Sequence, residues 1–378
     1  MSKKIRLYLI IGAAAVVLLA TGVVVAVNLF TNKVDSSIPQ ADLFSTPPVG
    51  SPTTASSPRT SPTPPPGADI VGPLNILIVG VDTREDEPDW QPKADAVMIM
   101  HVNKGLDSAY LTSLPRDQLV DIPAYAPAHF GGERSKLTHA MAFESVVPGS
   151  TIPNPVQGFP LLAQTVSSYT GIDHFDAGAI LTFTGMRDLV NAIGGVDIYI
   201  DEQTASIHGQ PDGSGRIPCA TCPNGVTGPA MTYTVGTTMH LVGWQALDYS
   251  RQRYIPGGDY SRQRHQRQMI KAIMKKIISG GYVVSPPRIL DLMDALGKTL
   301  IFDGRGRKPS EFIYALRNLT PDKITLVGLQ GDGVYSGGSY LGENLRPIEA
   351  PFFAAMKADT LPAFLTANAS LLNPATAG

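Results

Sequence analysis

The pattern of apolar and polar positions divides the 378-residue chain into parts of different character. Residues 7–30 form one charge-free apolar run, which as a helix would be about 36 Å long and could span a bilayer. Residues 31–72 are rich in Pro, Ser and Thr, a composition typical of a disordered or extended linker. Short apolar runs and helical periodicities recur from residue 73 onward and predict a folded domain.

The apolar run follows a short tail, residues 1–6, that carries Lys3, Lys4 and Arg6. Because positively charged flanks stay in the cytoplasm, we expect a single-pass protein of the cell membrane, with a cytoplasmic N-terminus and an external folded part. A cleaved signal peptide is the alternative. The run is longer than the usual signal-peptide core of about 7–15 residues, and no small-x-small cleavage site follows, which favours a retained transmembrane anchor.

Three short apolar runs predict buried strands separated by polar or turn residues, at Leu74–Val81, Ala96–Val102 and Ala109–Leu114. If these strands form an antiparallel meander, the end of the first, the start of the second and the end of the third lie at one edge of the sheet. Asp82, Asp95 and Arg116 then converge at that edge.

Two carboxylates that face one space are costly unless a cation lies between them. Oxygen ligands suggest a hard ion, so Asp82 and Asp95 are candidate ligands of Mg²⁺ or Mn²⁺. Two solvated loop aspartates are the alternative, but the nearby Arg116 favours a site for a metal and a phosphate. Asp95 and Asp117 are both candidates for a general base.

The remaining periodicities predict one more strand, at Val196–Ile200, and helices at Leu137–Ser145, Pro160–Tyr169, Phe183–Ile193 and Tyr260–Ile278. The Gly/Pro-rich stretch Asp201–Val235 is predicted to be a long loop. This order of elements predicts an α/β fold in which a mixed central sheet is flanked by helices.

We expect this folded domain to cover residues 73–279. Residues 280–350 either extend its sheet or form a small lobe, and contain predicted helices at Arg288–Leu296 and Ser310–Leu319 and a predicted strand at Ile324–Leu329. Residues 351–378 are rich in Ala and Leu with turn signals and are expected to form a C-terminal tail.

Positive charge is concentrated between residues 246 and 276, although the whole chain has a formal net charge of −2. Near-neutral charge argues against nucleic-acid binding, whereas planar guanidinium groups suit phosphate. Tyr249, Arg251 and Arg253 alternate as on a strand, which would place both arginines on one face.

In the predicted helix 260–278, the apolar stripe extends back to Gln266 and Arg262, which would point inward near the helix N-terminus, where anions are favoured. Four basic residues fall on the opposite face and are predicted to be solvated: Arg264, Arg267, Lys271 and Lys275.

The only two cysteines, Cys219 and Cys222, lie within the predicted loop. A local disulfide is the preferred interpretation, because no second CxxC pair exists and no His pair has metal-site spacing. A redox pair and half of a metal site are the alternatives.

Five segments occur in the order expected of one family: NILIVGVD, SLPRD, NAIGGVDIYI, GWQALDYSRQR and GGDYSRQRHQRQ. With the short tail and the single predicted span, the chain resembles the LytR-CpsA-Psr family over about residues 74–279. The resemblance implies a membrane-anchored, Mg²⁺-dependent bacterial phosphotransferase. Such an enzyme transfers a glycopolymer, a teichoic acid or a capsule, from a polyprenyl-pyrophosphate carrier to peptidoglycan in the cell wall.

The resemblance also implies roles for individual residues. Asp82 and Asp95 would hold the metal, and the catalytic arginines that clamp the pyrophosphate would be Arg116, Arg251, Arg253 and Arg262. Further contacts to the pyrophosphate would come from Arg84, Lys93, Lys136 and Gln266. The family often has Arg where this chain has Lys93, which keeps the charge and loses the bidentate fork. Hydrolysis of the same carrier and a non-catalytic envelope regulator that binds anionic lipid are the alternative functions.

Overall fold

The computed structural model describes residues 32–44, 67–82, 89–146, 152–280, 297 and 300–373. The predicted tail and transmembrane anchor, Arg84 and the predicted helix Arg288–Leu296 lie outside these ranges. Within the described ranges, the helices are all too short or too polar to cross a membrane.

A six-stranded sheet forms the centre of the fold, in the order β13-β6-β1-β2-β3-β14. The β1–β2 and β2–β3 pairs are antiparallel, so the predicted meander is confirmed. Strand β6 runs parallel to β1 and β14 runs parallel to β3, which makes the sheet mixed, as predicted. The strands are β1 (Leu74–Val81), β2 (Ala94–Val102), β3 (Ala109–Leu114), β6 (Ala177–Thr182), β13 (Leu300–Asp303) and β14 (Ile324–Gly328).

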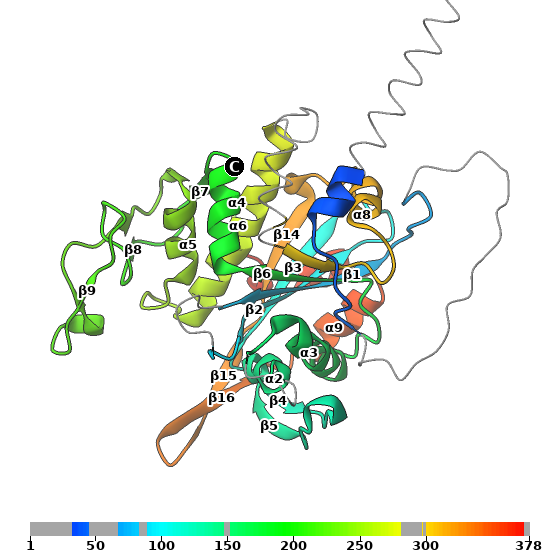
Figure 1. Ribbon diagram of the computed structural model, residues 1–378, viewed down its shortest axis with the longest axis horizontal. Helices are drawn as coiled ribbons and strands as arrows, with labels where there is room; N and C mark the ends of the chain where they lie inside the picture. Colours follow the sequence, from blue (N-terminus) through cyan, green and yellow to red (C-terminus); the bar gives the residue numbers. More distant parts are fainter. Residues whose placement is uncertain are drawn as a thin grey trace, which may run out of the picture.

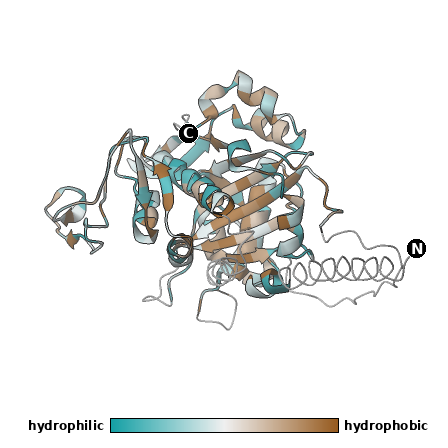
Figure 2. Ribbon diagram, turned by 90° about the horizontal axis from the view of Figure 1, so that it is seen from above, coloured by the Kyte–Doolittle hydropathy of each residue, from teal (hydrophilic) through white to brown (hydrophobic). Residues whose placement is uncertain are grey.

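Helices cover both faces of this sheet (Figure 1). Alternate side chains of β1 enter two separate cores, with Leu74 and Ile76 on one face and Leu77 and Val79 on the other. The helices over the first core are α4 (Phe183–Ala192), α5 (Gly243–Arg251), α6 (Asp259–Ser279) and α8 (Pro309–Ala315). Those over the second are α2 (Leu137–Glu144), α3 (Pro155–Thr170), α9 (Glu349–Lys357) and α10 (Leu361–Ala367). Figure 2 shows the apolar strands enclosed between these layers.

The fold continues past the predicted domain limit at residue 279, and of the two alternatives for residues 280–350, extension of the sheet is confirmed. Strands β13 and β14 complete the two edges of the central sheet. The predicted C-terminal tail is wrong for residues 351–373, because Phe352 and Phe353 are buried in the second core and Asn373 bonds to Leu326. Apolar side chains at helical spacing stabilise these short helices only through that packing.

The first residues of the predicted linker are part of the folded domain. Residues 32–37 are helical, and Val34, Ile38 and Leu43 are buried. The backbone of Phe302 in β13 donates to the carbonyl of Pro39 at 2.9 Å. Burial of these apolar side chains against the domain offsets the ordering cost of the segment.

Smaller ladders surround the central sheet. Strand β7 (Val196–Tyr199) pairs with β12 (Thr238–Leu241). Residues 201–235 form a projecting arm, seen at the left of Figure 1, rather than an irregular loop. Its short elements are β8 (Thr204–Ala205), β9 (Ile217–Pro218), η2 (Pro223–Gly225), β10 (Val226–Thr227) and β11 (Thr232–Tyr233).

Two more ladders lie at the lower side of Figure 1, formed by β4 (Leu119–Ile122) with β5 (Glu133–Lys136) and by β15 (Gly331–Ser336) with β16 (Ser339–Leu345). Three further short 3-10 turns are η1 (Ala126–Ala128), η3 (Pro321–Lys323) and η4 (Ala369–Leu371). The arm carries the Cys219–Cys222 disulfide, so the preferred interpretation of the two cysteines is confirmed.

Candidate active site

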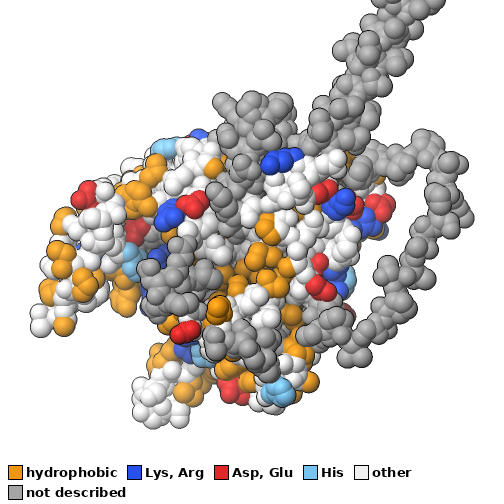
Figure 3. All heavy atoms as spheres, viewed as in Figure 1, with side chains coloured by type: hydrophobic (Ala, Val, Ile, Leu, Met, Phe, Trp, Pro, Cys, Tyr) orange, Lys and Arg blue, Asp and Glu red, His pale blue; other side chains and the backbone are white. Residues whose placement is uncertain are grey.

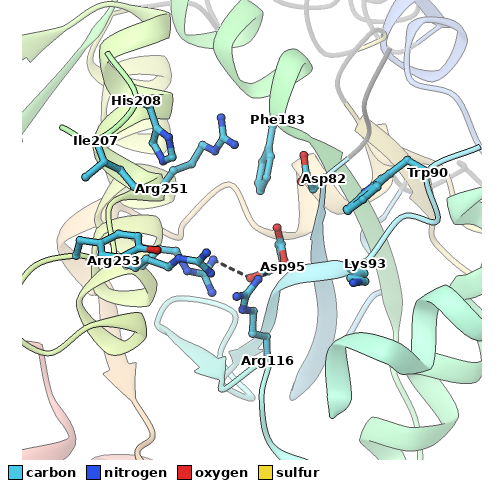
Figure 4. Close-up of a pocket in the computed structure, with 12 residues that line it drawn as sticks. Asp82, Trp90, Lys93, Asp95, Arg116, Phe183, Ile207, His208, Arg251 and Arg253 are labelled. Atoms are coloured by element: carbon cyan, nitrogen blue, oxygen red, sulfur yellow. Dashed lines mark hydrogen bonds and ion pairs between the residues drawn. The ribbon is translucent and has the colours of Figure 1, made fainter. Parts of the chain in front are cut away.

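A cavity of about 350 Å³ opens at the sheet edge where the meander was predicted to gather polar residues (Figure 4). Its walls come from the ends of the central strands, from α4 and α5, from the start of α6 and from the arm. The lining residues are Asp82, Trp90, Lys93, Asp95, Arg116, Phe183, Ile207, His208, Arg251, Arg253, Tyr254 and Arg262.

The meander places the first three of the predicted residues. Asp82 follows the last residue of β1, and Arg116 follows the end of β3 by two residues. Asp95 lies at a β-bulge, because Gly80 pairs with Ala96 while the next residue of β1 pairs with Ala94. A bulge turns the side chain of the extra residue out of the regular alternation. The predicted convergence of Asp82, Asp95 and Arg116 is therefore confirmed.

Arg116 lies among carboxylates. Its Nη1 donates to Oδ1 of Asp95 at 2.5 Å, and its Nε lies 3.7 Å from Asp259 and 4.0 Å from Asp117. Burial alone would lower the pKa of Arg116, but the three carboxylates outweigh burial and raise it. The guanidinium thus stays charged at one wall of the cavity.

Arg262 reaches the same wall from the first turn of α6. Its Nη1 donates to the backbone carbonyl of Asp95 at 2.8 Å. Its Nε and Nη2 donate to the two carboxylate oxygens of Asp259, at 2.8 and 3.1 Å. This bidentate pair fixes the guanidinium plane. Gly257 and Gly258, with φ of 79° and 56°, make the turn before the helix.

Asp259 is a site residue that sequence reasoning missed. It bonds Arg262 and forms an ion pair with Arg116, so one carboxylate contacts two cavity arginines. Burial would raise its pKa, but the two arginines outweigh burial and lower it. The i,i+3 spacing of Asp259 and Arg262 just after the glycine pair was the signal that could have identified it.

Arg251 and Arg253 both line the cavity, but the predicted strand is wrong. Arg251 is the last residue of helix α5, and the backbone becomes extended at Gln252. Ala246 and Tyr249, three residues apart, are both fully buried against the first core, and this packing favours the helix. The two arginines share the cavity because the helix ends between them.

The predicted division of α6 is partly right. Arg262 and Gln266 are 5% and 7% exposed, but Gln266 does not line the cavity. Lys275 is exposed, as predicted. The other three basic residues were predicted to be solvated, and this prediction is wrong, because the arm, β14 and the C-terminal segment cover that face of α6. Arg264 bonds Asp201 and Glu202. Arg267 is buried and bonds Asn373, and Lys271 bonds the carbonyl of Ile324.

Of the two lysines predicted to contact the pyrophosphate, only one lines the cavity. Lys93 lines the cavity, with its Nζ 5.5 Å from the centre of the Trp90 ring. Lys136 does not line it, and its Nζ lies 3.6 Å from Asp117 and over the ring of Tyr340. Lys136 thus supports the cavity wall through Asp117, which neighbours Arg116.

Two lining residues, Ile207 and His208, come from the arm and were also missed. The arm has neither helical nor strand periodicity, so the sequence carried no signal for them. The backbone N–H of His208 donates to Oγ of Ser206 at 2.9 Å, which holds the arm against α5 through the bond from Ser206 to Asp248.

The charge balance of the cavity favours an anionic ligand. Its lining includes three more cationic than anionic side chains, because Lys93 and four arginines face Asp82 and Asp95. On the face shown in Figure 3, by contrast, described basic and acidic side chains are interspersed. Several guanidinium groups around one space match the oxygens of a phosphate or pyrophosphate.

The mixed sheet between two helical layers, with a cationic cavity at one sheet edge, defines an α/β protein with a candidate site for an anionic ligand. The LytR_cpsA_psr family model matches residues 52–350. The chain belongs to the LytR-CpsA-Psr family.

Two relatives and one solved structure illustrate the similarity. The polyisoprenyl-teichoic acid–peptidoglycan teichoic acid transferase TagU of Enterococcus faecalis is 30% identical over 266 residues, 69% of this chain and 73% of the relative. The cell wall biosynthesis protein LcpA of Corynebacterium glutamicum is 25% identical over 303 residues, 74% of this chain and 54% of the relative. The protein gbs0355 of Streptococcus agalactiae has the same fold, with a TM-score of 0.56, 24% identity and coverage of 76% and 87%.

Proposed function

We propose that this chain is a membrane-anchored phosphotransferase that moves a glycopolymer from a polyprenyl-pyrophosphate carrier onto peptidoglycan in bacterial cell-wall assembly. The observation that carries the proposal is the gathering of Asp82, Asp95 and four arginines around one cavity. The name of the related E. faecalis transferase supports the same substrates.

In the proposed reaction, a hydroxyl of the acceptor glycan attacks the phosphorus next to the glycopolymer. A new phosphodiester bond forms, and the bond from that phosphorus to the carrier phosphate breaks. The carrier leaves as polyprenyl phosphate. Phosphoryl transfer depends mainly on positioning and charge neutralisation. Arg251, Arg253 and Arg262 would hold the pyrophosphate oxygens, and Arg116 and Lys93 would add positive charge at the sheet edge.

The carboxylates fit a Mg²⁺ or Mn²⁺ ion that takes its other ligands from the substrate. Among the described residues, no group of three His, Cys, Asp or Glu side chains could hold a metal by itself. Magnesium commonly uses one or two protein carboxylates together with phosphate oxygens and water. Asp82 and Asp95 would hold the ion, and when bound it would neutralise charge on the phosphate oxygens.

The test uses the full-length protein in detergent, with a polyprenyl-pyrophosphate-linked oligosaccharide as donor and peptidoglycan as acceptor. Wild type should release polyprenyl phosphate and attach the sugar only when Mg²⁺ or Mn²⁺ is present. Arg262→Ala should lower the rate by about 10²- to 10³-fold, as loss of one preorganised charge donor does elsewhere. Lys275→Ala, on the exposed face of the same helix, is the matched control.

Three results would contradict the proposal in different ways. Release of sugar phosphate without attachment to the acceptor would identify a hydrolase. Tight donor binding without turnover would identify a non-catalytic regulator. Unchanged transfer by Asp82→Ala would remove the metal assignment while leaving the transfer itself intact.

A further inference from the structure

The proposed transfer requires a group that accepts the proton of the attacking hydroxyl, and the carboxylates near the cavity are poorly suited to that task. Asp95 is bonded to Arg116 at 2.5 Å, and with Asp82 it is a proposed metal ligand. Asp117 lies beside Lys136 and Arg116 and does not line the cavity. Asp95 and Asp117 are thus already engaged by neighbouring basic side chains.

His208 offers a different proton acceptor within the same cavity. Among the described lining residues it is the one imidazole. Figure 4 shows its ring beside Arg251, on the side of the cavity opposite Trp90 and Lys93. The residue is exposed and lines the cavity, so its side chain is open to solvent. An attacking hydroxyl could therefore approach from the arm while the carboxylates face the other end of the substrate.

The arm holds His208 in place through a buried polar network. Oγ of Ser206 accepts the backbone N–H of His208 at 2.9 Å and donates to Oδ1 of Asp248 at 2.7 Å. Oε1 of Gln252 accepts the backbone N–H of Ile207 at 3.1 Å. Ser206 and Gln252 are fully buried. Since Gln252 lies between Arg251 and Arg253, this network ties the arm to the segment that carries both arginines.

The surroundings of His208 favour its neutral imidazole. Partial burial of the ring and the guanidinium groups of Arg251 and Arg253 lower its pKa, and Asp248 opposes them only in part. A neutral imidazole has a free nitrogen lone pair at pH 7 and can accept a proton. The negative charge of a bound pyrophosphate would offset the repulsion between the arginines and the imidazolium that forms.

We propose that His208 is the general base of this transfer, a role that rests on the proposed function. A ring nitrogen of His208 takes the proton of the acceptor hydroxyl as the oxygen forms its bond to phosphorus. The bond to the carrier phosphate breaks, and its electron pair leaves with polyprenyl phosphate. The arm is thus a functional part of the active site.

The first test compares wild type with His208→Gln in the full-length transfer assay between pH 5 and 8. General bases typically contribute about 10²- to 10⁴-fold, so kcat should fall by that factor while the KM for the donor changes little. Wild-type kcat/KM should fall as pH drops through the lowered pKa of His208, and the variant should lack this dependence. His240→Gln, an exposed histidine paired with Asp197 outside the cavity, should behave as wild type.

The second test uses His208→Ala with added imidazole. Partial recovery of the rate, saturating with imidazole concentration, would support the base role, because a merely structural side chain is not replaced in this way. Binding of farnesyl pyrophosphate to each variant gives a readout independent of chemistry. Loss of this binding with unchanged kcat would identify His208 as a phosphate ligand and overturn the proposal.

The assay distinguishes failure of the proposed transfer from failure of the base role of His208. If wild type shows no transfer, the proposed function fails. If wild type transfers and His208→Gln keeps both its kcat and the acidic limb of its pH profile, only the assignment of the base is wrong.

Discussion

Replacing Asp259 by Asn removes the carboxylate that holds Arg262 and forms an ion pair with Arg116. Asp259 receives two hydrogen bonds from Arg262, at 2.8 and 3.1 Å, and lies 3.7 Å from Nε of Arg116. The Arg262 side chain is only 6% exposed, so water cannot fully replace the lost partner. The variant therefore leaves a buried guanidinium held mainly by the carbonyl of Asp95.

The expected loss in the free energy of unfolding follows from these contacts. Removing one partner of a fully buried ion pair costs about 3–5 kcal/mol, and one hydrogen bond to a charged group contributes about 1.5–3 kcal/mol. The Asp259 side chain is 22% exposed. Since Asn also keeps one acceptor oxygen, we expect a loss of about 2–3 kcal/mol in the free energy of unfolding. The melting temperature should fall by roughly 5 °C.

The assay is thermal unfolding at pH 7 and at lower pH, with Asp332→Asn as the matched control. Asp332 forms an exposed pair with Arg346, and such pairs contribute about 0–1 kcal/mol. The lowered pKa of Asp259 means that its stabilisation is present above pH about 4 and is lost as pH falls through its folded pKa. The two melting curves should thus converge in acid. Equal, small losses in both variants at pH 7 would refute the reasoning.

Two further predictions concern the supporting structure. Glu349 is buried, and burial raises its pKa to about 8, so the folded state holds a proton that the unfolded state releases above pH about 4.3. Wild type should therefore lose stability between about pH 5 and 8, and Glu349→Gln should flatten this loss in thermal unfolding; parallel curves would contradict the shift. Arg264→Ala should destabilise the domain by about 1–3 kcal/mol, since it breaks bonds to Asp201 and Glu202, whereas exposed Lys275→Ala should cost less than about 0.5 kcal/mol. Equal melting temperatures for these two variants would restore the solvated interpretation of Arg264.

Local pattern was sufficient for much of the fold. The runs Leu74–Val81 and Ala109–Leu114 are strands with the predicted ends, and the helix from Phe183 ends one residue before the expected limit. Such elements are predictable because the spacing of apolar residues within a short stretch of sequence shows which side chains will be buried. The meander followed from short connections, and it brought Asp82, Asp95 and Arg116 to one edge.

Elements whose neighbours lie far along the chain were not predictable in this way. The strand expected at Tyr249–Arg253 is the end of a helix, because packing against the first core outweighs a short alternation. Arg267 is covered by a segment some hundred residues later, which includes Asn373. A periodicity shows that a helix has two faces, but not which distant segment covers the second.

The sequence alone thus determined the strands of the meander, the carboxylates and arginines at its edge, and the motifs of the family. Only the tertiary structure decided that β13 and β14 complete the sheet, that Asp259 contacts two cavity arginines, and that the arm brings His208 into the cavity. The physical reason is the range of the interactions. Helices and strands depend on contacts between near neighbours, whereas a site depends on which distant segments share one buried surface.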